Sequence, residues 1–289
     1  MPYPDDPALH AAAKALLGSA WPRVPPGIDL ARAWGGDWFE ISTPFFRFEG
    51  GTPVGHVGVI EIPLSFDGHD LTVAGIHGVC VHPAHRGRGH LREAMREALT
   101  WVDARHDTAI LWTGEPDIYT RYGFQRCEEH IFKGPCPEGR SGQSRALALH
   151  DPEDLHLLRD LLARREAVSA RSATRDPGWL FLIDLALWPG AVERGVLRYF
   201  PDLECVVVCD LKEGALQIHD VIAPRIPPLA ALLPGLPGPA DRIEVLITPD
   251  RLDAPALVPA PQPSIDLLMV RGRPLPVRSP FTLSPLTRC

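Results

Sequence analysis

Apolar residues in the first half of the chain fall in short runs, and many of these runs show the alternation typical of strands. Strands are predicted over residues 45–49, 55–63 and 71–81, and a fourth, wholly apolar one over 108–113. Residues 65–70, SFDGHD, contain an Asp-Gly pair, which is a strong signal for a tight hairpin turn. The second and third strands are therefore expected to pair antiparallel.

Two segments of the first half place apolar residues at helical spacing. Residues 7–19 predict a helix that ends near Gly18. The clearest helix covers residues 88–105, and its apolar face consists of Leu91, Ala94, Met95, Ala98, Leu99 and Val102. Residues 20–44 are rich in Pro, Gly and Trp and are expected to be irregular. A helical turn is predicted over 116–122, and one or two strands over 124–133.

A second series of elements follows a Gly/Pro/Ser-rich stretch at residues 134–144, which we take as a domain boundary. The predicted domains are residues 1–138 and 139–289. Helices are predicted over 152–169, with Asp151 as N-cap, and over 228–233. Predicted strands cover residues 145–149, 195–200, 204–211, 215–222, 242–248 and 265–271. Both halves thus give a mixed α/β pattern, as a duplication would.

Composition narrows the class of protein further. The formal net charge of −7 argues against a general nucleic-acid binder. The long apolar run at residues 179–187 is too short to span a bilayer and contains Asp184, and the acidic N-terminal residues do not form a signal peptide. The six cysteines form no CxxC pair, and Cys205 and Cys209 share one face of a predicted buried strand. We expect reduced thiols and a cytoplasmic protein without a membrane partner.

The segment with the most chemical content is residues 78–91, GVCVHPAHRGRGHL, between a predicted strand and the clearest helix. Backbone amides at a helix N-terminus lack intrahelical hydrogen-bond partners and therefore favour the binding of an anion. Gly87 and Gly89 would let a phosphate approach the backbone, and Arg86 and Arg88 add positive charge. The segment is neither a Walker loop nor a GxGxxG loop. The alternatives are a pyrophosphate cradle and an ordinary turn between strand and helix.

The sequence around residues 78–91 resembles the GNAT N-acetyltransferase superfamily. The pattern V-x-P-x-x-R-G-x-G precedes an amphipathic helix, a strand follows, and then Y-x-x-x-G-F ends at Phe124. Leu91 stands where the family usually has Gly or Ala, a departure that resembles the Eis-like branch. Residues 45–133 carry the resemblance. Residues 220–233 occupy the matching place in the second half but lack the Arg/Gly loop, which resembles that branch's degenerate second GNAT domain.

The resemblance implies an α/β fold with two GNAT-like domains, each a central mixed β-sheet flanked by helices. It also implies acetyl-CoA as cosubstrate, no metal, and Tyr119 as the general acid toward the CoA sulfur. Tyr119 could instead be a core residue, although Tyr122 suits that role better. The residues expected to contact CoA are Val79, Cys80, Val81, Arg86, Gly87, Arg88, Gly89, His90, Leu91, Gly114 and Glu115.

The sequence leaves several candidates for the general base. In the Eis-like branch the C-terminal carboxylate serves as base, which implies the carboxylate of Cys289, unless that terminus is frayed. His77 and Glu61 are the alternatives, and both suit structural or solvent-facing roles better.

Two further clusters invite other interpretations. His77, Cys80, His82, His85 and His90 are dense enough to suggest zinc. Strand alternation would put His77 and Cys80 on opposite faces, however, and the later histidines lie in the loop expected to hold phosphate, so no metal is predicted. The aromatic residues within 34–46 could line an acceptor pocket or pack in the core, and core packing is the favoured interpretation.

The favoured function is acetyl transfer from acetyl-CoA to a small-molecule amine by a monomer or homodimer that needs no nucleic acid. The resemblance to the Eis-like branch implies an aminoglycoside-like amine as one candidate acceptor. The alternatives are a CoA-binding regulatory module without turnover and a protein-interaction scaffold.

Overall fold

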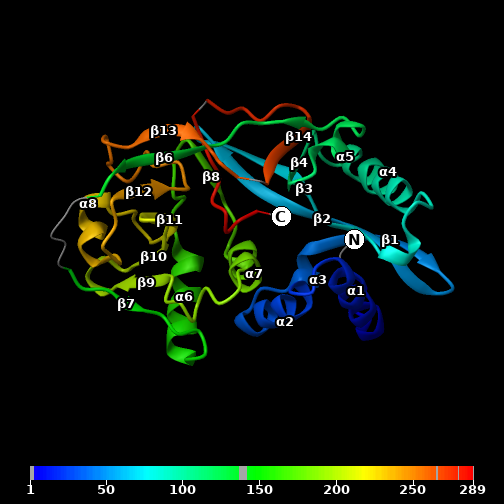
Figure 1. The fold of residues 1–289 in the computed structure, drawn as a ribbon, viewed down its shortest axis with the longest axis horizontal. Helices are drawn as coiled ribbons and strands as arrows, with labels where there is room; N and C mark the ends of the chain where they lie inside the picture. The colour runs from blue at the N-terminus through cyan, green and yellow to red at the C-terminus, as the bar shows by residue number, and fades with distance from the viewer. Residues whose placement is uncertain (1–2, 137–141, 265, 279, 289) are drawn as a thin grey trace.

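The strands form two mixed sheets that lie side by side along the long axis of the molecule (Figure 1). The computed structural model describes residues 3–136, 142–264, 266–278 and 280–288. Within these residues each sheet has seven strands, and helices pack around both. The mixed α/β fold class predicted from the sequence is confirmed.

The first sheet has the order β1-β2-β3-β4-β14-β5, and β8 pairs with β2 beside this path. Its strands are β1 (Ser42–Glu49), β2 (Thr52–Phe66), β3 (His69–Val81), β4 (Thr108–Thr113), β5 (Gln125–Arg126), β8 (Ser172–Thr174) and β14 (Leu267–Gly272). β2 and β3 form the predicted antiparallel hairpin, with Asp67 and Gly68 at positive φ in its turn. Gly50 and Gly51 make the same kind of turn between β1 and β2, where positive φ favours glycine.

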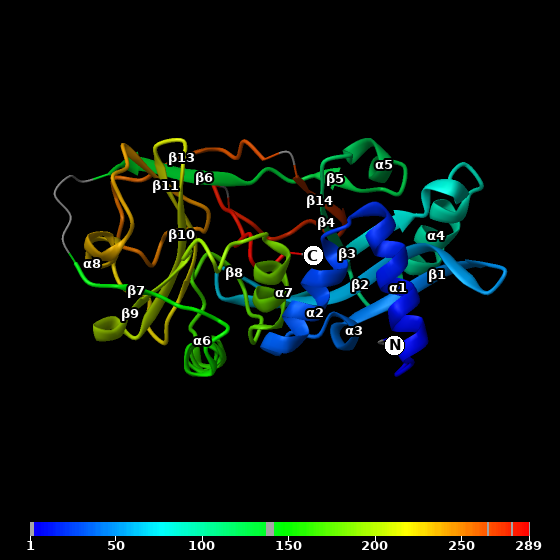
Figure 2. The same cartoon turned by 60° about the horizontal axis from the view of Figure 1, so that its bottom comes forward.

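Helices cover both faces of this sheet, as the turned view in Figure 2 shows. One face carries α4 (His90–Asp103), whose predicted apolar side is buried against β1, β2 and β3. The other face carries α1 (Pro7–Ala20), α2 (Val24–Trp34) and α3 (Trp38–Ile41). The expectation that residues 20–44 are irregular was therefore wrong. The prolines of α2 lie in its first turn, where a helix tolerates them because the amide there needs no partner.

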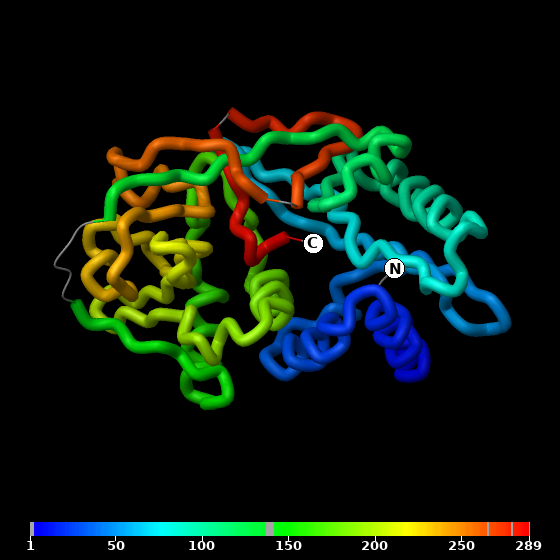
Figure 3. The backbone as a smooth tube through the Cα atoms, viewed as in Figure 1, coloured from blue at the N-terminus to red at the C-terminus, as the bar shows by residue number. Residues whose placement is uncertain are grey.

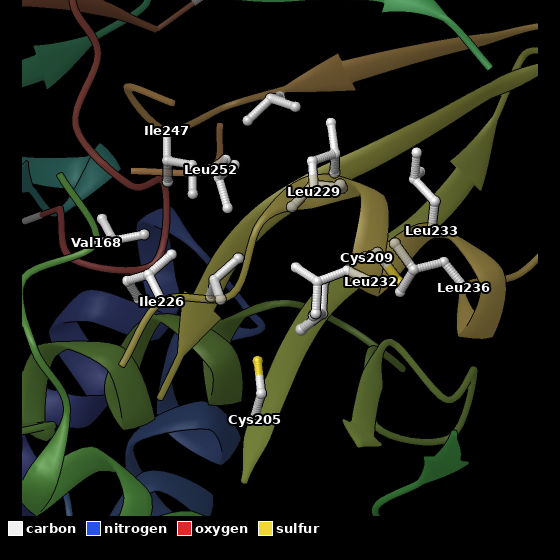
Figure 4. Packing of buried hydrophobic residues seen from close by; sticks show 14 of the residues in the cluster. Val168, Cys205, Cys209, Ile226, Leu229, Leu232, Leu233, Leu236, Ile247 and Leu252 are labelled. Carbon is white, nitrogen blue, oxygen red and sulfur yellow. The ribbon is translucent and has the colours of Figure 1, made fainter. Parts of the chain in front are cut away.

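The second sheet has the order β13-β6-β12-β11-β10-β9-β7. Its strands are β6 (His130–Pro135), β7 (Arg145–Ala146), β9 (Leu197–Phe200), β10 (Cys205–Lys212), β11 (Ala215–Ile222), β12 (Arg242–Val245) and β13 (Val258–Pro261). The four-residue α8 (Leu229–Leu232) packs with Cys205 and Cys209 in the core on one face (Figure 4). On the other face lies α6 (Pro152–Arg164), whose N-cap Asp151 accepts a hydrogen bond from the Glu153 amide at 2.9 Å, as predicted.

Helix α7 (Trp179–Leu187) lies between the two sheets and was not predicted. Phe181 packs into the core of the second sheet, Leu180 into that of the first, and Ile183 against α1 and α2. Because α7 is surrounded by apolar partners, its sequence has no polar face and gives no helical period. The apolar run at residues 179–187 is too short for a membrane span. No helix within the described residues is long and apolar enough to cross a bilayer.

The strands do not divide at the expected boundary between residues 138 and 139. β6 precedes that point but belongs to the second sheet, whereas β14 and β8 follow it and belong to the first. The chain crosses between the sheets along their upper edge, as the tube in Figure 3 shows. Each sheet is therefore completed by a segment from the other half of the sequence.

Candidate active site

The candidate site lies where two parallel strands of the first sheet separate. β3 pairs with β4 only at Ala74 with Ala109 and Gly75 with Ile110. Beyond this point β4 stays paired with β14 and β3 stays paired with β2 as far as Val81, so the sheet opens between β3 and β4. A pocket of about 610 Å³ opens between them, lined by both strands and by the start of α5 (Pro116–Thr120).

A bulge in β3 shapes this opening. The pairing of β2 with β3 shifts between His56 and Gly58, and Gly78 has a φ of +56°. The extra residue restarts the alternation of side chains, as bulges do. His77 and Cys80 therefore both pack toward α1 and α3, where Trp38 contacts the His77 ring and shares a core with Cys80. The expectation that His77 and Cys80 lie on opposite faces was wrong.

The expected anion-binding loop joins β3 to α4. Gly87 and Gly89 both have positive φ, and a side chain at Gly87 would extend into open space. Gly89 precedes the first turn of α4, whose amides have no intrahelical partners. Arg86 bonds the Val81 carbonyl through Nε at 3.3 Å. The loop thus places two glycines with positive φ and two arginines directly ahead of the N-terminus of α4.

Glu49, at the end of β1, is a neighbour of this loop that the sequence did not reveal. It accepts hydrogen bonds from Arg88, His85 and His90 at 2.9, 3.0 and 2.6 Å. These bonds, the one from His90 foremost, hold the pKa of the Glu49 carboxyl below its ordinary value. Arg88 is thus already paired with a carboxylate in the structure.

Tyr119 lies in α5 with its ring at the pocket wall. It is only 8% exposed and packs in the core beneath α4, with the ring of Phe124 at 6.2 Å. Gly123 turns the chain at a φ of +87°, which lets Phe124 fold back. Tyr122 is less buried than Tyr119, so the expectation that Tyr122 is the better core residue was wrong.

The pocket is completed by residues far apart in the sequence. Gly114 and Glu115 line it between β4 and α5, and their contact with CoA stays a prediction. Trp21, Asp266, Pro285 and Arg288 also line it and carried no signal in the sequence, because distant segments bring them here.

The segment that contains Pro285 and Arg288 is held by buried polar groups. The Glu129 carboxylate accepts hydrogen bonds from Trp112, from the amide of Leu283 and from the guanidinium of Arg288. The Arg288 amide donates to Asp184 at 2.8 Å. Cys289 itself lies outside the described residues, so its expected role as base stays a prediction.

Of the two alternative bases, His77 lines this pocket and Glu61 does not. The His77 ring bonds Ser42 Oγ at 2.7 Å, and burial holds its pKa well below the usual value, so the ring is neutral. Glu61 is exposed, pairs with His106 at 3.2 Å and lines a different cavity.

The large aromatic residues from α2 to the start of β1 pack in the core. Trp34, Trp38, Phe39 and Phe45 are buried and belong to three different apolar clusters. None of them lines the pocket between β3 and β4. Core packing, the favoured interpretation of this stretch, agrees with their positions.

Comparison with known proteins agrees with this geometry. A family model for the GNAT acetyltransferase domain matches residues 9–127. The uncharacterized N-acetyltransferase YhbS of Escherichia coli K12 is 29% identical over 68 residues, which are 24% of this chain. That match spans only 41% of the length of YhbS.

Two solved structures share the fold over most of the chain. A protein of unknown function from Enterococcus faecalis V583, described as a probable N-acyltransferase, has a TM-score of 0.60 at 15% identity. The superposition covers 91% of this chain and 70% of that one. Eis1 from Mycobacterium abscessus has a TM-score of 0.58 at 18% identity, covering 94% of this chain and 73% of Eis1. Residues 9–127, which hold the separated strands, the glycine-arginine loop and Tyr119, therefore match the GNAT acetyltransferase domain, and the chain shares its overall fold with Eis1.

Proposed function

We propose that this protein is an acetyl-CoA-dependent N-acetyltransferase that transfers the acetyl group directly from the CoA thioester to an amine. The observation that carries the proposal is the separation of β3 from β4 over a pocket with an anion-binding loop beside it. A long, flexible cosubstrate with a pyrophosphate at one end and a thioester at the other fits this arrangement.

The loop would hold the pyrophosphate. The amides in the first turn of α4, which begins at His90, lack intrahelical partners, and Arg86 and Arg88 supply two positive charges. For Arg88 this requires exchange of the Glu49 carboxylate for a phosphate oxygen.

The open edge of β3 would bind the rest of the cosubstrate. Residues 79–81 lie beyond the part of β3 that pairs with β4, so their backbone groups on that side can bond the pantetheine arm and the thioester carbonyl. Such amides stabilise the negative charge that develops on this oxygen when the amine attacks.

Tyr119 would act as the general acid. The attack breaks the C–S bond and expels a thiolate, and the Tyr119 hydroxyl at the pocket wall would donate a proton to that sulfur. The attacking amine would lose its own proton to the general base, for which the Cys289 carboxylate stays the prediction. Glu115 and Asp266 line the same pocket and would attract a cationic amine, which is compatible with an aminoglycoside-like acceptor.

Binding is tested by titrating acetyl-CoA into the wild type and into Arg86→Ala/Arg88→Ala. We expect affinity to fall about 10-fold or more in the variant, because charge-assisted contacts to phosphate are lost. Arg96→Ala, on the exposed side of α4, is the matched control and should bind like the wild type. If the wild type does not bind acetyl-CoA, the loop is an ordinary turn and the proposal fails.

Turnover is tested with a panel of amines and thiol release as readout. Tyr119→Phe should lower kcat about 100-fold while leaving acetyl-CoA affinity unchanged, since the acid acts only on the leaving thiolate. Tyr122→Phe is the control and should retain activity. Unchanged turnover in Tyr119→Phe would remove the proposed acid, and binding without turnover of any amine would favour a regulatory CoA-binding module.

A further inference from the structure

Three side chains that bind transition metals in other proteins meet beside the glycine-arginine loop. They are Glu49 from the end of β1, His85 from the short 3-10 turn after β3, and His90 from the first position of α4. Their nearest ligand atoms all lie within 4.8 Å of one another. They form the one such group among the residues that the structure describes.

We propose that Glu49, His85 and His90 form a binding site for a transition-metal dication, with Zn²⁺ as the ion that their donor atoms favour. Two imidazole nitrogens and one carboxylate are a common zinc ligand set, and a water completes a tetrahedron. Ligands at about 2.0–2.2 Å from zinc stand about 3.4 Å apart. The three ligand atoms, which lie within 4.8 Å of one another, would close to that separation when an ion binds.

The surrounding fold holds the three ligands in place. His85 sits on a turn whose first amide is capped by His82, where the Ala84 amide donates to Nδ1 at 3.3 Å. His90 is half-buried, with its Cβ beside Gly55 of β2. The two Glu49 oxygens face different histidines: Oε1 faces His90 and Oε2 faces His85. An ion bound between the carboxylate and the two rings would take the place of these two hydrogen bonds.

Arg88 competes with the metal for Glu49. Its guanidinium bonds both oxygens of that carboxylate, at 2.9 and 3.3 Å. An ion bound to Glu49 would displace the guanidinium and free it toward the loop. The positive charge near the loop would also increase by two, and this favours an anion bound there.

A link between metal and acetyl-CoA follows, and this part rests on the proposed function. If the loop holds the pyrophosphate, Zn²⁺ should tighten acetyl-CoA binding, and acetyl-CoA should tighten Zn²⁺ binding by the same factor. The metal site itself needs no cosubstrate and can be tested alone.

The experiment uses the full chain without an affinity tag, stripped with a chelator and titrated with Zn²⁺ by calorimetry and with Co²⁺ by visible absorption. We expect one ion per chain and a Co²⁺ spectrum of tetrahedral type. Glu49→Gln and His85→Ala/His90→Ala should each weaken binding by at least about 10-fold. Arg88→Ala should strengthen it, because it removes the competing cation, and circular dichroism of each variant checks that its fold is unchanged.

His106 with Glu61 is the matched control, since it is a histidine-carboxylate pair with a single histidine. His106→Ala/Glu61→Gln should leave metal binding unchanged. Absence of saturable binding, or binding that the Glu49 and histidine variants do not alter, would overturn the metal site. Zn²⁺ that binds these residues without changing acetyl-CoA affinity would overturn only the link, and acetyl-CoA that fails to bind at all would instead count against the proposed function.

Discussion

At the scale of single residues, buried histidines support the sheet beside the pocket. His56 is 1% exposed, and its Nδ1 donates to the Gly78 carbonyl at 2.7 Å while its Nε2 accepts from the Tyr3 hydroxyl at 2.5 Å. A carbonyl can only accept, so this network fixes the neutral tautomer. His56 thus connects the N-terminal segment to the bulge that shapes the site.

This burial predicts a pH dependence of stability. Desolvation lowers the pKa of His56 to about 4, against 6.5 without burial. Between these values the unfolded chain binds a proton at His56 that the folded chain does not, so stability rises with pH from about 4 to 6.5. The contribution is about 3 kcal/mol over the whole interval.

Urea unfolding at several pH values from 4.5 to 7 measures this slope. His56→Gln should unfold more easily at neutral pH and show a shallower rise of stability with pH. His69→Gln, at the exposed β2–β3 turn, is the control and should keep the wild-type slope. Equal slopes in all three proteins would mean that His56 takes up its proton in the folded state as easily as in the unfolded one.

At the scale of elements, the bulge in β3 determines which side chains face which helix. Without an extra residue at Gly78, Cys80 would turn toward α4 instead of toward α1. Gly78 meets two requirements at once. Its φ is positive, and a Cβ there would lie 3.2 Å from two atoms of the His56 ring.

A comparison of Gly78 with Gly50 separates the cost of backbone strain from the cost of the contact with His56. Gly50 also has a φ of +56°, but a Cβ there would have nothing within 4 Å. Gly50→Ala should therefore cost only the backbone strain, about 1 kcal/mol. Gly78→Ala should cost about 2–4 kcal/mol, because the His56 ring must also move. Urea unfolding of both variants checks the difference, and an equal cost would show that the contact with His56 is unimportant.

At the scale of the whole molecule, the exchange of strands makes the two sheets depend on each other. β14 covers the full edge of β4, and Leu268 and Phe281 share a core with Ile60 and Ile62 of β2. α7 connects the apolar clusters of both halves. The molecule should therefore unfold as one unit despite its two sheets.

A fragment of residues 1–138 should not fold by itself. It would expose the edge of β4 and lose the apolar cover from β14 and α7, so aggregation or disorder is expected. Circular dichroism and thermal unfolding of this fragment, compared with the full chain, measure the outcome. Coexpression with residues 139–289 is the control and should restore solubility. A monomeric 1–138 fragment with a sharp thermal transition would contradict this dependence.

Local patterns in the sequence determined the elements that build the core of the site. The helical period of α4, the Asp-Gly turn between β2 and β3, and the glycines of the loop each act within a few residues, so they can be read without tertiary structure. Residues far apart along the chain decided the rest. The place of β14, the apolar surroundings of α7 and the meeting of Glu49 with His85 and His90 depend on long-range pairing, which leaves no local periodicity. The bulge at Gly78 placed Cys80 on the opposite face from the one expected. One extra residue in β3 shifts the alternation of side chains, and the pattern of apolar and polar residues in the sequence does not reveal it.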